Sequence, residues 1–327
     1  MLLGPFFSSL ENYDVVNVRK QMCKVFSNKT EVKMCYPFDN VREIDSFFED
    51  CLHTLGTALH DLERRTLICI EGASSDGCNW IGTMGNYFGT FNVPFLNIAA
   101  TCRLVHMRFH EFYRINENKV DQVQVIWDIP ELMMQANSWP MAPQLGSFMC
   151  TPGPLTCDGV NIEGGGDGHA LAHVQTMLKD MSKHPSNPDP AIMQLEKYWH
   201  PNFNWYGPCG IGTSRGIKGF RNIHQIPFLR AMPDRRLDMD AGLKSNWISQ
   251  ENYVCETGWP NMRLTLSNDG WLGLNPSGLE IEMRSLDFWR LENGLIRENW
   301  VLIDLLDIYK QLGVDVFDRM SALPTRM

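Results

Sequence analysis

Residues 104–137, LVHMRFHEFYRINENKVDQVQVIWDIPELMMQAN, and residues 280–313, EIEMRSLDFWRLENGLIRENWVLIDLLDIYKQLG, carry the same pattern twice. The whole repeated block aligns Pro94–Asn137 with Gly270–Gly313 without a gap, and eight of its 44 residue pairs are identical. Most other pairs exchange similar side chains. One inserted residue would move every strand side chain to the opposite face, so the unbroken register indicates two structurally similar units.

The composition is typical of a globular chain with two domains. The sequence has 327 residues, of which 44% are apolar and 20% charged, and this length allows two domains that each bury a core. The net charge of −9 and the lack of a basic run argue against a nucleic-acid partner. No apolar stretch approaches the roughly 20 residues of a membrane span, and Met1–Leu10 lacks the pattern of a signal peptide. We expect no membrane contact and a cytoplasmic location.

The stretch between the two copies is rich in Gly, Pro and Ser, which predicts a linker. We therefore predict a first domain at 1–140, a linker at 141–188 and a second domain at 189–327. His169 and His173 would share one face of a helix, but no third ligand stands at a recognisable spacing. The ten cysteines are scattered without a Cys-x-x-Cys pair, so we predict reduced thiols and no metal site.

Both copies predict the α+β class, with helices followed by a curved antiparallel sheet that forms a cone. Helices are expected at 15–26, 41–59, 129–136, 190–199, 216–230 and 305–312. Strands are expected at 65–71, 79–89, 102–115, 120–127, 237–245, 252–266, 279–291 and 295–303. Residues 200–211 are interpreted as an aromatic turn, and Asp189 as the cap of the helix that follows it.

Strand alternation selects the residues that would face a pocket in the second copy. One face of the strand from Glu280 to Arg290 is mainly apolar and contains a single carboxylate, Asp287. A carboxylate among apolar side chains has a raised pKa, which suits a general acid or base near neutral pH. Asp304 ends an aromatic row on the next strand, so Asp287 and Asp304 are the acid/base candidates. An alternative for Asp304 is that it only caps the following helix.

Other residues extend this candidate site. His224, on the predicted helix 216–230, is a candidate proton partner. The second copy is rich in large aromatic residues, which is compatible with a pocket for a flat, apolar ligand. The predicted substrate-binding residues are Trp205, Tyr206, Trp259, Met283, Trp289 and Trp300. The equivalents of the candidate site residues in the first copy are Asp128, Glu111 and Tyr113.

Three segments of the second copy resemble the SnoaL-like polyketide cyclases of the NTF2-like superfamily: Arg215–Phe220, Asp287–Ile296 and Ile303–Gly313. The first copy is similar more faintly. The resemblance implies a cone-shaped fold, a hydrophobic, polyketide-like substrate and an aldol ring closure without a cofactor, in which Asp304 would move the proton. Because typical members are single-domain chains that dimerise, it also implies that the two copies pack as an internal pseudo-dimer, with a homodimer of whole chains as a further possibility.

The sequence leaves three classes of function open. The first is a cofactor-independent cyclase or isomerase that uses Asp304 with Asp287 or His224. The second is a hydrolase similar to limonene-type epoxide hydrolases, for which Asp287, Arg290 and Asp304 have the right chemical types, although alternation places Arg290 opposite Asp287. The third is a non-catalytic module for ligand binding or assembly. Whether the chain is an enzyme stays open at this stage.

Overall fold

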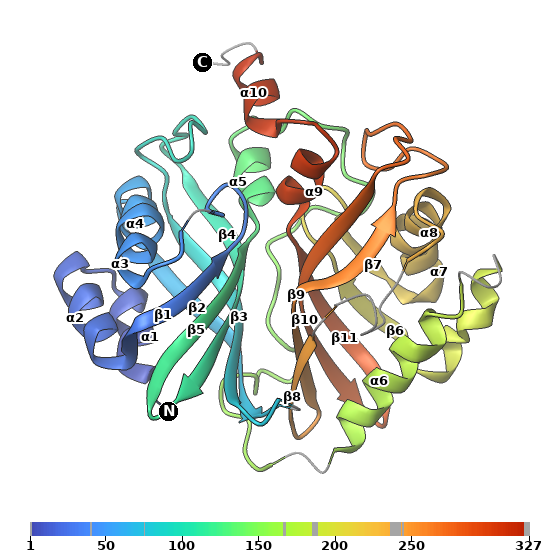
Figure 1. Cartoon of the computed structure of the whole chain (residues 1–327), viewed down its shortest axis with the longest axis horizontal. Coiled ribbons are helices and arrows are strands. Elements are labelled where there is room, and N and C mark those ends of the chain that lie inside the picture. The colour runs from blue at the N-terminus through green and yellow to red at the C-terminus, as the bar shows by residue number, and fades with distance from the viewer. Residues whose placement is uncertain are drawn as a thin grey trace.

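The chain folds into two halves, each a sheet with helices packed against it. The computed structural model describes residues 2–39, 41–74, 76–165, 168–184, 189–235, 243 and 245–323. Figure 1 shows the blue-to-green first half and the yellow-to-red second half side by side. The first sheet has the strand order β1-β5-β4-β3-β2, and the second has the order β7-β6-β11-β10-β9-β8. The prediction of two tandem α+β domains is confirmed.

Short helices alternate with the strands of the first sheet: two precede β1, two lie between β1 and β2, and one follows β5. The helices are α1 (Gly4–Glu11), α2 (Val15–Val25), α3 (Ile44–Ser46), α4 (Thr54–Ala58) and α5 (Ile129–Gln135), with a π-helical turn, Phe47–His53, between α3 and α4. The strands are β1 (Phe26–Met34), β2 (Glu63–Ala73), β3 (Asn79–Thr90), β4 (Leu104–Asn116) and β5 (Lys119–Trp127).

The second half repeats this order after a helix of its own. The helices are α6 (His169–Met181), α7 (Gly216–Phe220), α8 (Ile226–Ala231), α9 (Leu305–Gln311) and α10 (Val316–Ser321), with 3-10 turns at Pro190–Met193 and Leu195–Lys197. The strands are β6 (Trp199–Tyr206), β7 (Thr213–Arg215), β8 (Ser245–Gln250), β9 (Tyr253–Thr265), β10 (Glu280–Glu292) and β11 (Leu295–Ile303). None of the described helices is long and apolar enough to cross a membrane.

The predicted hairpin strands are confirmed, whereas four strands, β1, β6, β7 and β8, escape prediction. β1 and β6 run parallel to β5 and β11, far away in the sequence. The expected aromatic turn at 200–211 is therefore wrong over β6, because parallel pairing needs no local hairpin signal. The expected helix 190–199 forms only the two 3-10 turns, although Asp189 caps the first by accepting the Ala191 N–H. The expected strand 237–245 lies almost wholly outside the described residues.

The repeat corresponds to equal contacts in the two halves. Gln135 accepts the backbone N–H of His106 at 3.0 Å and donates to its carbonyl at 2.6 Å. Gln311 does the same to Glu282, at 2.8 and 2.7 Å. Each pair of hydrogen bonds fixes the helix after the last strand to the start of the preceding strand. It joins α5 to β4 in the first half and α9 to β10 in the second. This shared contact accounts for an identical glutamine in two otherwise divergent copies.

The two sheets pack against each other through equivalent side chains. The rings of Phe112 on β4 and Phe288 on β10 lie 5.3 Å apart, centroid to centroid. His110 Nδ1 lies 2.6 Å from the Leu286 carbonyl. Gly82 allows the close approach, because a Cβ there would lie 2.8 Å from the Cys255 sulfur. The face of each sheet that meets the other domain is thus dedicated to packing, which leaves the opposite face for a site.

Candidate functional site in the second domain

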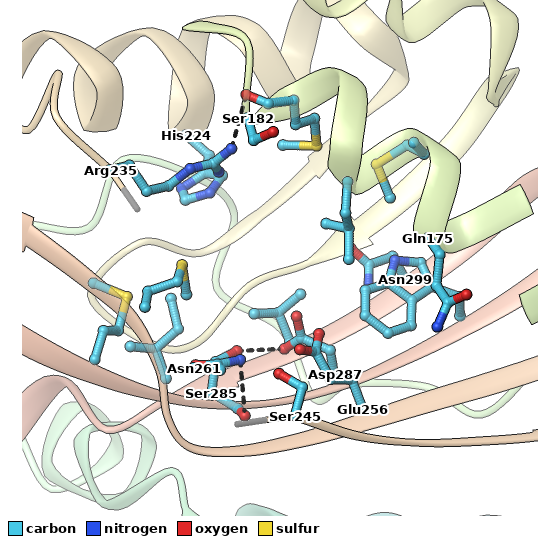
Figure 2. Close-up of a pocket in the computed structure, with 18 of the residues that line it drawn as sticks. Gln175, Ser182, His224, Arg235, Ser245, Glu256, Asn261, Ser285, Asp287 and Asn299 are labelled. Atoms are coloured by element: carbon cyan, nitrogen blue, oxygen red, sulfur yellow. Dashed lines mark hydrogen bonds between the residues drawn. The ribbon is translucent and has the colours of Figure 1, made fainter. Parts of the chain in front are cut away.

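A cavity of about 760 Å³ lies inside the second domain, between the sheet and the helices α6, α7 and α8. Figure 2 shows side chains from both walls pointing into it. Six aromatic residues line it: Trp199, Trp205, Phe220, Phe228, Trp247 and Trp289. The volume suits a drug-sized ligand. One wall comes from α6, which lies within the stretch that the sequence analysis assigns to a linker.

Two carboxyl groups face the cavity from neighbouring strands. Asp287 on β10 lines it together with Met283, Ser285 and Trp289, as the strand alternation predicts. Glu256 on β9 stands directly opposite Asp287 in the register of the sheet. The Ser285 hydroxyl donates to Asp287 at 2.6 Å. No Lys or Arg among the described residues forms an ion pair with either carboxyl, so the pair is uncompensated.

Burial dominates the acid strength of this pair. It raises the pKa of Asp287 well above the usual range, and the charge of Glu256 adds to this, while the Ser285 hydrogen bond acts in the opposite sense. Burial also raises the pKa of Glu256, to about 7, against the hydrogen bonds of Ser245 and Asn261. Burial thus shifts the pKa of both carboxyls upward from the ordinary acidic range, so neither ionises as readily as it would in water. This is the arrangement that a general acid and a general base require.

His224 faces the same cavity from the helical wall. It lies on a π-helical turn, Arg221–Gln225, between α7 and α8, and such turns recur at functional sites. Its ring stacks on Trp205 with centroids 4.3 Å apart and planes 14° apart. Burial and the charge of Arg235 lower the pKa of His224 to about 3, so the ring is neutral at physiological pH. Its Nδ1 has no partner among the described residues. A neutral ring can orient a ligand by a hydrogen bond.

Asp304 lies on the other face of the sheet, away from the cavity. Asp287 pairs with Val301, and paired residues on neighbouring strands face the same side of the sheet. Asp304 comes three positions after Val301, so it faces the opposite side, toward the first domain. There Asp304 accepts the Tyr36 N–H at 3.0 Å and an Arg284 N–H at 3.2 Å. It also caps α9 through the Asp307 N–H. The capping alternative thus agrees with the geometry, and Asp304 additionally joins the two domains.

Asp128 makes the mirror-image contact in the first domain. It accepts the Cys209 N–H at 3.0 Å and an Arg108 N–H at 3.2 Å. Arg108 also donates to the carbonyls of Tyr206 and Gly207. The identical Asp128/Asp304 and Arg108/Arg284 pairs of the repeat are therefore two symmetric interdomain clamps. Their identity is explained by domain packing.

The predicted substrate-binding residues divide into three that line the cavity and three that lie outside it. Trp205, Met283 and Trp289 line the cavity. Tyr206 and Trp300 lie outside it, stacked on each other at 5.5 Å, and the Trp300 indole donates to the Pro152 carbonyl. Trp259 lies under the guanidinium of Arg284, 5.0 Å from it. The side chains of Tyr206, Trp259 and Trp300 therefore do not line the cavity.

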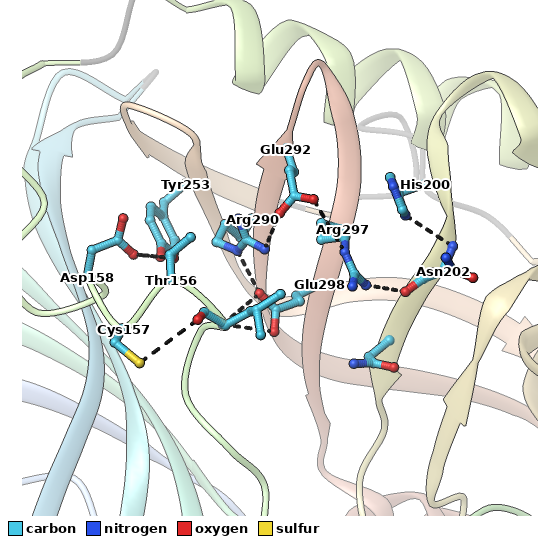
Figure 3. A network of polar contacts seen from close by, with 12 residues as sticks. Thr156, Cys157, Asp158, His200, Asn202, Tyr253, Arg290, Glu292, Arg297 and Glu298 are labelled. Atoms are coloured by element: carbon cyan, nitrogen blue, oxygen red, sulfur yellow. Dashed lines mark hydrogen bonds and ion pairs between the residues drawn. The ribbon is translucent and has the colours of Figure 1, made fainter.

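Arg290 lies on the face of β10 opposite Asp287, as alternation predicts, and its ion pairs are with two glutamates. Figure 3 shows it in a polar network, where its Nε donates to Glu298 at 2.6 Å and its Nη2 to Glu292 at 3.1 Å. Glu298 in turn accepts the backbone N–H of Leu155. The aspartate–arginine–aspartate arrangement of the hydrolase alternative is therefore not formed.

The position of Asp287 is occupied in the first domain by Glu111, which is fully bound. Glu111 accepts from Arg64 at 3.0 Å, Tyr87 at 2.8 Å, Tyr113 at 2.6 Å and the Trp127 indole at 3.3 Å. Burial and Glu111 raise the pKa of both tyrosines, so their hydroxyls stay protonated. Glu111 and Tyr113 are thus part of a packed core, with a cation next to the carboxylate.

The sequence analysis missed Glu256, Arg235 and the contribution of α6. Glu256 lies on a predicted strand, but only the register places it opposite Asp287. A bulge between Met283 and Ser285 then brings Asn261 to the cavity as well.

Among the described residues, no three His, Cys, Asp or Glu side chains form a potential metal-binding group. His173 Nε2 lies 3.0 Å from the Tyr198 carbonyl.

Comparisons with known proteins find a family match in the second half of the chain. Residues 186–312 match the family model of the SnoaL-like polyketide cyclases. No curated protein matches the sequence significantly. Similar solved structures include AclR of Streptomyces galilaeus, a suspected hydroxylase, with 15% identity over 44% of this chain and 83% of that one, at a TM-score of 0.36. They also include TsrD of Streptomyces laurentii, with 23% identity over 43% and 96%, at 0.33. A SnoaL-like polyketide cyclase of Agrobacterium tumefaciens has 18% identity over 41% and 94%, at 0.32.

Proposed function

We propose that the second domain is a cofactor-independent cyclase or isomerase that acts on a hydrophobic, polyketide-like small molecule. The observation that carries this proposal is the pair Asp287 and Glu256, two uncompensated carboxyls on opposing strands of an aromatic cavity. The match of residues 186–312 to the SnoaL-like polyketide cyclases supports the reaction class. The second domain is then the working unit, and the first domain holds it in place.

The two carboxyls divide the chemistry of an intramolecular aldol closure. Glu256, as the carboxylate, removes a proton from a carbon next to a carbonyl group. The resulting enolate attacks a second carbonyl in the same molecule, and Asp287, as the acid, donates its proton to the oxygen that becomes the hydroxyl. The product is an isomer of the substrate, so atoms and charge balance without a further reactant. Ser285 orients Asp287, and His224 binds the ligand as a neutral hydrogen-bonding group.

The experiment is a turnover assay in deuterated buffer. Aromatic β-keto esters with a second carbonyl in reach of ring closure are incubated with the protein, and mass spectrometry follows both deuterium uptake at carbon and the closed-ring isomer. We expect uptake and closure with the wild-type chain. Uptake that is equal with and without protein across the whole set would contradict the proposal.

Replacing Asp304 by asparagine tests the assignment of this residue to the domain contact. We expect turnover within about threefold of wild type, because Asp304 does not line the cavity, and a free energy of unfolding that is lower by about 1–3 kcal/mol, because a charged hydrogen bond to Arg284 is lost. Urea titration and the turnover assay measure the two effects. Asp128→Asn is the matched control at the symmetric clamp. A hundredfold loss of turnover at unchanged stability would return Asp304 to the catalytic role.

The raised pKa of Glu256 makes the stability of the fold depend on pH. The pKa is about 7 in the folded chain against an ordinary 4.5, so the folded state binds more protons in this window. The contribution of Glu256 to the free energy of unfolding therefore falls as the pH rises from about 4.5 to 7, by roughly 3 kcal/mol, and is level above it. Urea titrations at several pH values measure this, with Glu256→Gln as the reference. If the pH profiles of wild type and Glu256→Gln run parallel, this pKa is not raised.

A further inference from the structure

Arg235 stands at the cavity wall opposite the carboxyl pair. Figure 2 shows it beside His224, across the cavity from Glu256 and Asp287. Its side chain is only 7% exposed. One guanidinium nitrogen, Nη2, donates to the Met181 carbonyl at the end of α6, 2.9 Å away. Its Nε has no hydrogen-bond partner among the described residues. Burial lowers the pKa of Arg235 to about 10, so it remains a cation at neutral pH.

This lack of a carboxylate distinguishes Arg235 from the other buried arginines. Arg64, Arg108 and Arg290 are buried as well, and each forms an ion pair with an aspartate or glutamate. Among the described residues, Arg235 forms none. A buried charge without a counterion is costly, and an arginine cannot avoid the cost by losing its proton. A ligand anion in the cavity would supply the missing partner.

Within the described part of the chain, two further unpaired donors line the cavity, together with one unpaired acceptor, Asn261 Oδ1, and the imidazole Nδ1 of His224. The indole nitrogens of Trp199 and Trp289 have no acceptor among the described residues, and an indole N–H can only donate. Both side chains line the cavity. The cavity thus combines a cation, free N–H groups and flat apolar walls. This combination fits a planar molecule that is rich in oxygen acceptors and carries a negative charge.

We propose that the cavity binds a planar, apolar carboxylic acid whose carboxylate pairs with Arg235, while its ring system occupies the aromatic part of the cavity toward Asp287 and Glu256. A carboxylate fits this position because its two oxygens match the planar fork of a guanidinium. The proposal rests on the proposed function, since it names the class of substrate for the same site. Arg235 binds the carboxylate of the ligand at one wall. Asp287 and Glu256 act on the part of its carbon skeleton that bears the reacting carbonyl groups, at the other wall.

The test compares two probes that differ in charge alone, 2-anthracenecarboxylate and 2-anthracenecarboxamide. Binding is measured at neutral pH by quenching of tryptophan fluorescence, because Trp199, Trp205, Trp247 and Trp289 line the cavity. We expect the carboxylate to bind about tenfold or more tightly than the amide. Arg235→Gln should abolish this preference and leave amide binding unchanged. The matched control is Arg230→Gln, since Arg230 lies on α8, is exposed and does not line the cavity.

Several results would overturn the anion site. Equal affinity of the two probes for the wild-type chain contradicts it without any variant, as does a carboxylate preference that survives Arg235→Gln. Arg235→Lys covers the case in which the glutamine variant does not fold, because it keeps the charge and is expected to keep part of the preference. Binding needs no turnover, so a chain without ring-closure activity can still show the carboxylate preference, and an active chain can lack it. The binding and turnover results together separate a failed anion site from a failed catalytic assignment.

Discussion

Replacing Asp287 by asparagine is expected to lower kcat roughly 100- to 1,000-fold in the ring-closure assay. Asparagine has nearly the same shape and can still accept the Ser285 hydroxyl, but it cannot give up a proton to a reacting carbonyl oxygen. Glu256→Gln should cause a loss of similar size, because it removes the base across the strand pair. The double variant should lose little more than either single one, since the two groups act in one step.

Ligand binding distinguishes this loss from a damaged cavity. The affinity for 2-anthracenecarboxylate should stay within about threefold in Asp287→Asn, because the aromatic walls and Arg235 are untouched. A useful matched control is Asp318→Asn, a residue of α10 that does not line the cavity. Turnover of Asp287→Asn within tenfold of wild type would show that this carboxyl does not carry the proton.

Replacing Arg64 by methionine is expected to lower the free energy of unfolding by about 3–5 kcal/mol, the largest effect on stability that the structure predicts. Arg64 is buried, donates to Glu111 at 3.0 Å and lies between the rings of Phe7 and Phe109, 4.2 and 4.1 Å from its guanidinium carbon. Methionine preserves most of the apolar volume but leaves the Glu111 carboxylate buried without a cation. Urea denaturation at neutral pH measures the change.

A second substitution tests whether the buried charge is the cause. Arg64→Met combined with Glu111→Gln removes both charges and should recover about half of the loss or more, since no unpaired charge then remains. The Tyr87 hydroxyl can still donate to the amide oxygen of a glutamine, while the amide NH2 at the other position can donate to the Tyr113 hydroxyl oxygen. If the double variant is as unstable as the sum of the single ones, the loss comes from packing and the ion pair contributes little.

The two halves use one sheet position in opposite ways. In the first domain a buried arginine and two tyrosine hydroxyls neutralise and surround Glu111. In the second domain the equivalent Asp287 faces a cavity, with a serine and a second carboxyl as neighbours. The symmetric clamps between the domains are kept in both. We infer that the first half preserves the packing of the pair, while the second half retains the open site.

The sequence alone predicts the hairpins and the pocket face of β10, because alternation and the ungapped repeat are local signals. It places Met283, Asp287 and Trp289 on one face, and all three line the cavity. It does not predict β1 and β6, whose parallel partners are distant in the sequence. Parallel pairs of this kind depend on the assembled sheet, and the residues themselves carry no turn signal for them.

The sequence predicts a residue of the candidate site only where alternation within a single strand decides which side of the sheet it faces. The location of Asp304 depends on the register between β10 and β11, since the pairing of Asp287 with Val301 decides which parity of β11 faces the cavity. Glu256 requires the register of β9 in the same way. Arg235 requires the packing of α6 against the second sheet, which the Gly- and Pro-rich composition of the preceding stretch conceals. Long-range register and helix docking are therefore what the sequence does not reveal.

The most direct test of the central claim is a ¹³C NMR titration of the side-chain carboxyls of labelled protein, with Asp287→Asn and Glu256→Gln used to assign the two signals. We expect the Asp287 carboxyl to be still protonated at neutral pH and Glu256 to titrate near pH 7. A proton donor and a proton acceptor would then face each other in one cavity. Two ordinary carboxylates, both fully ionised by about pH 5, would contradict the proposed acid–base pair.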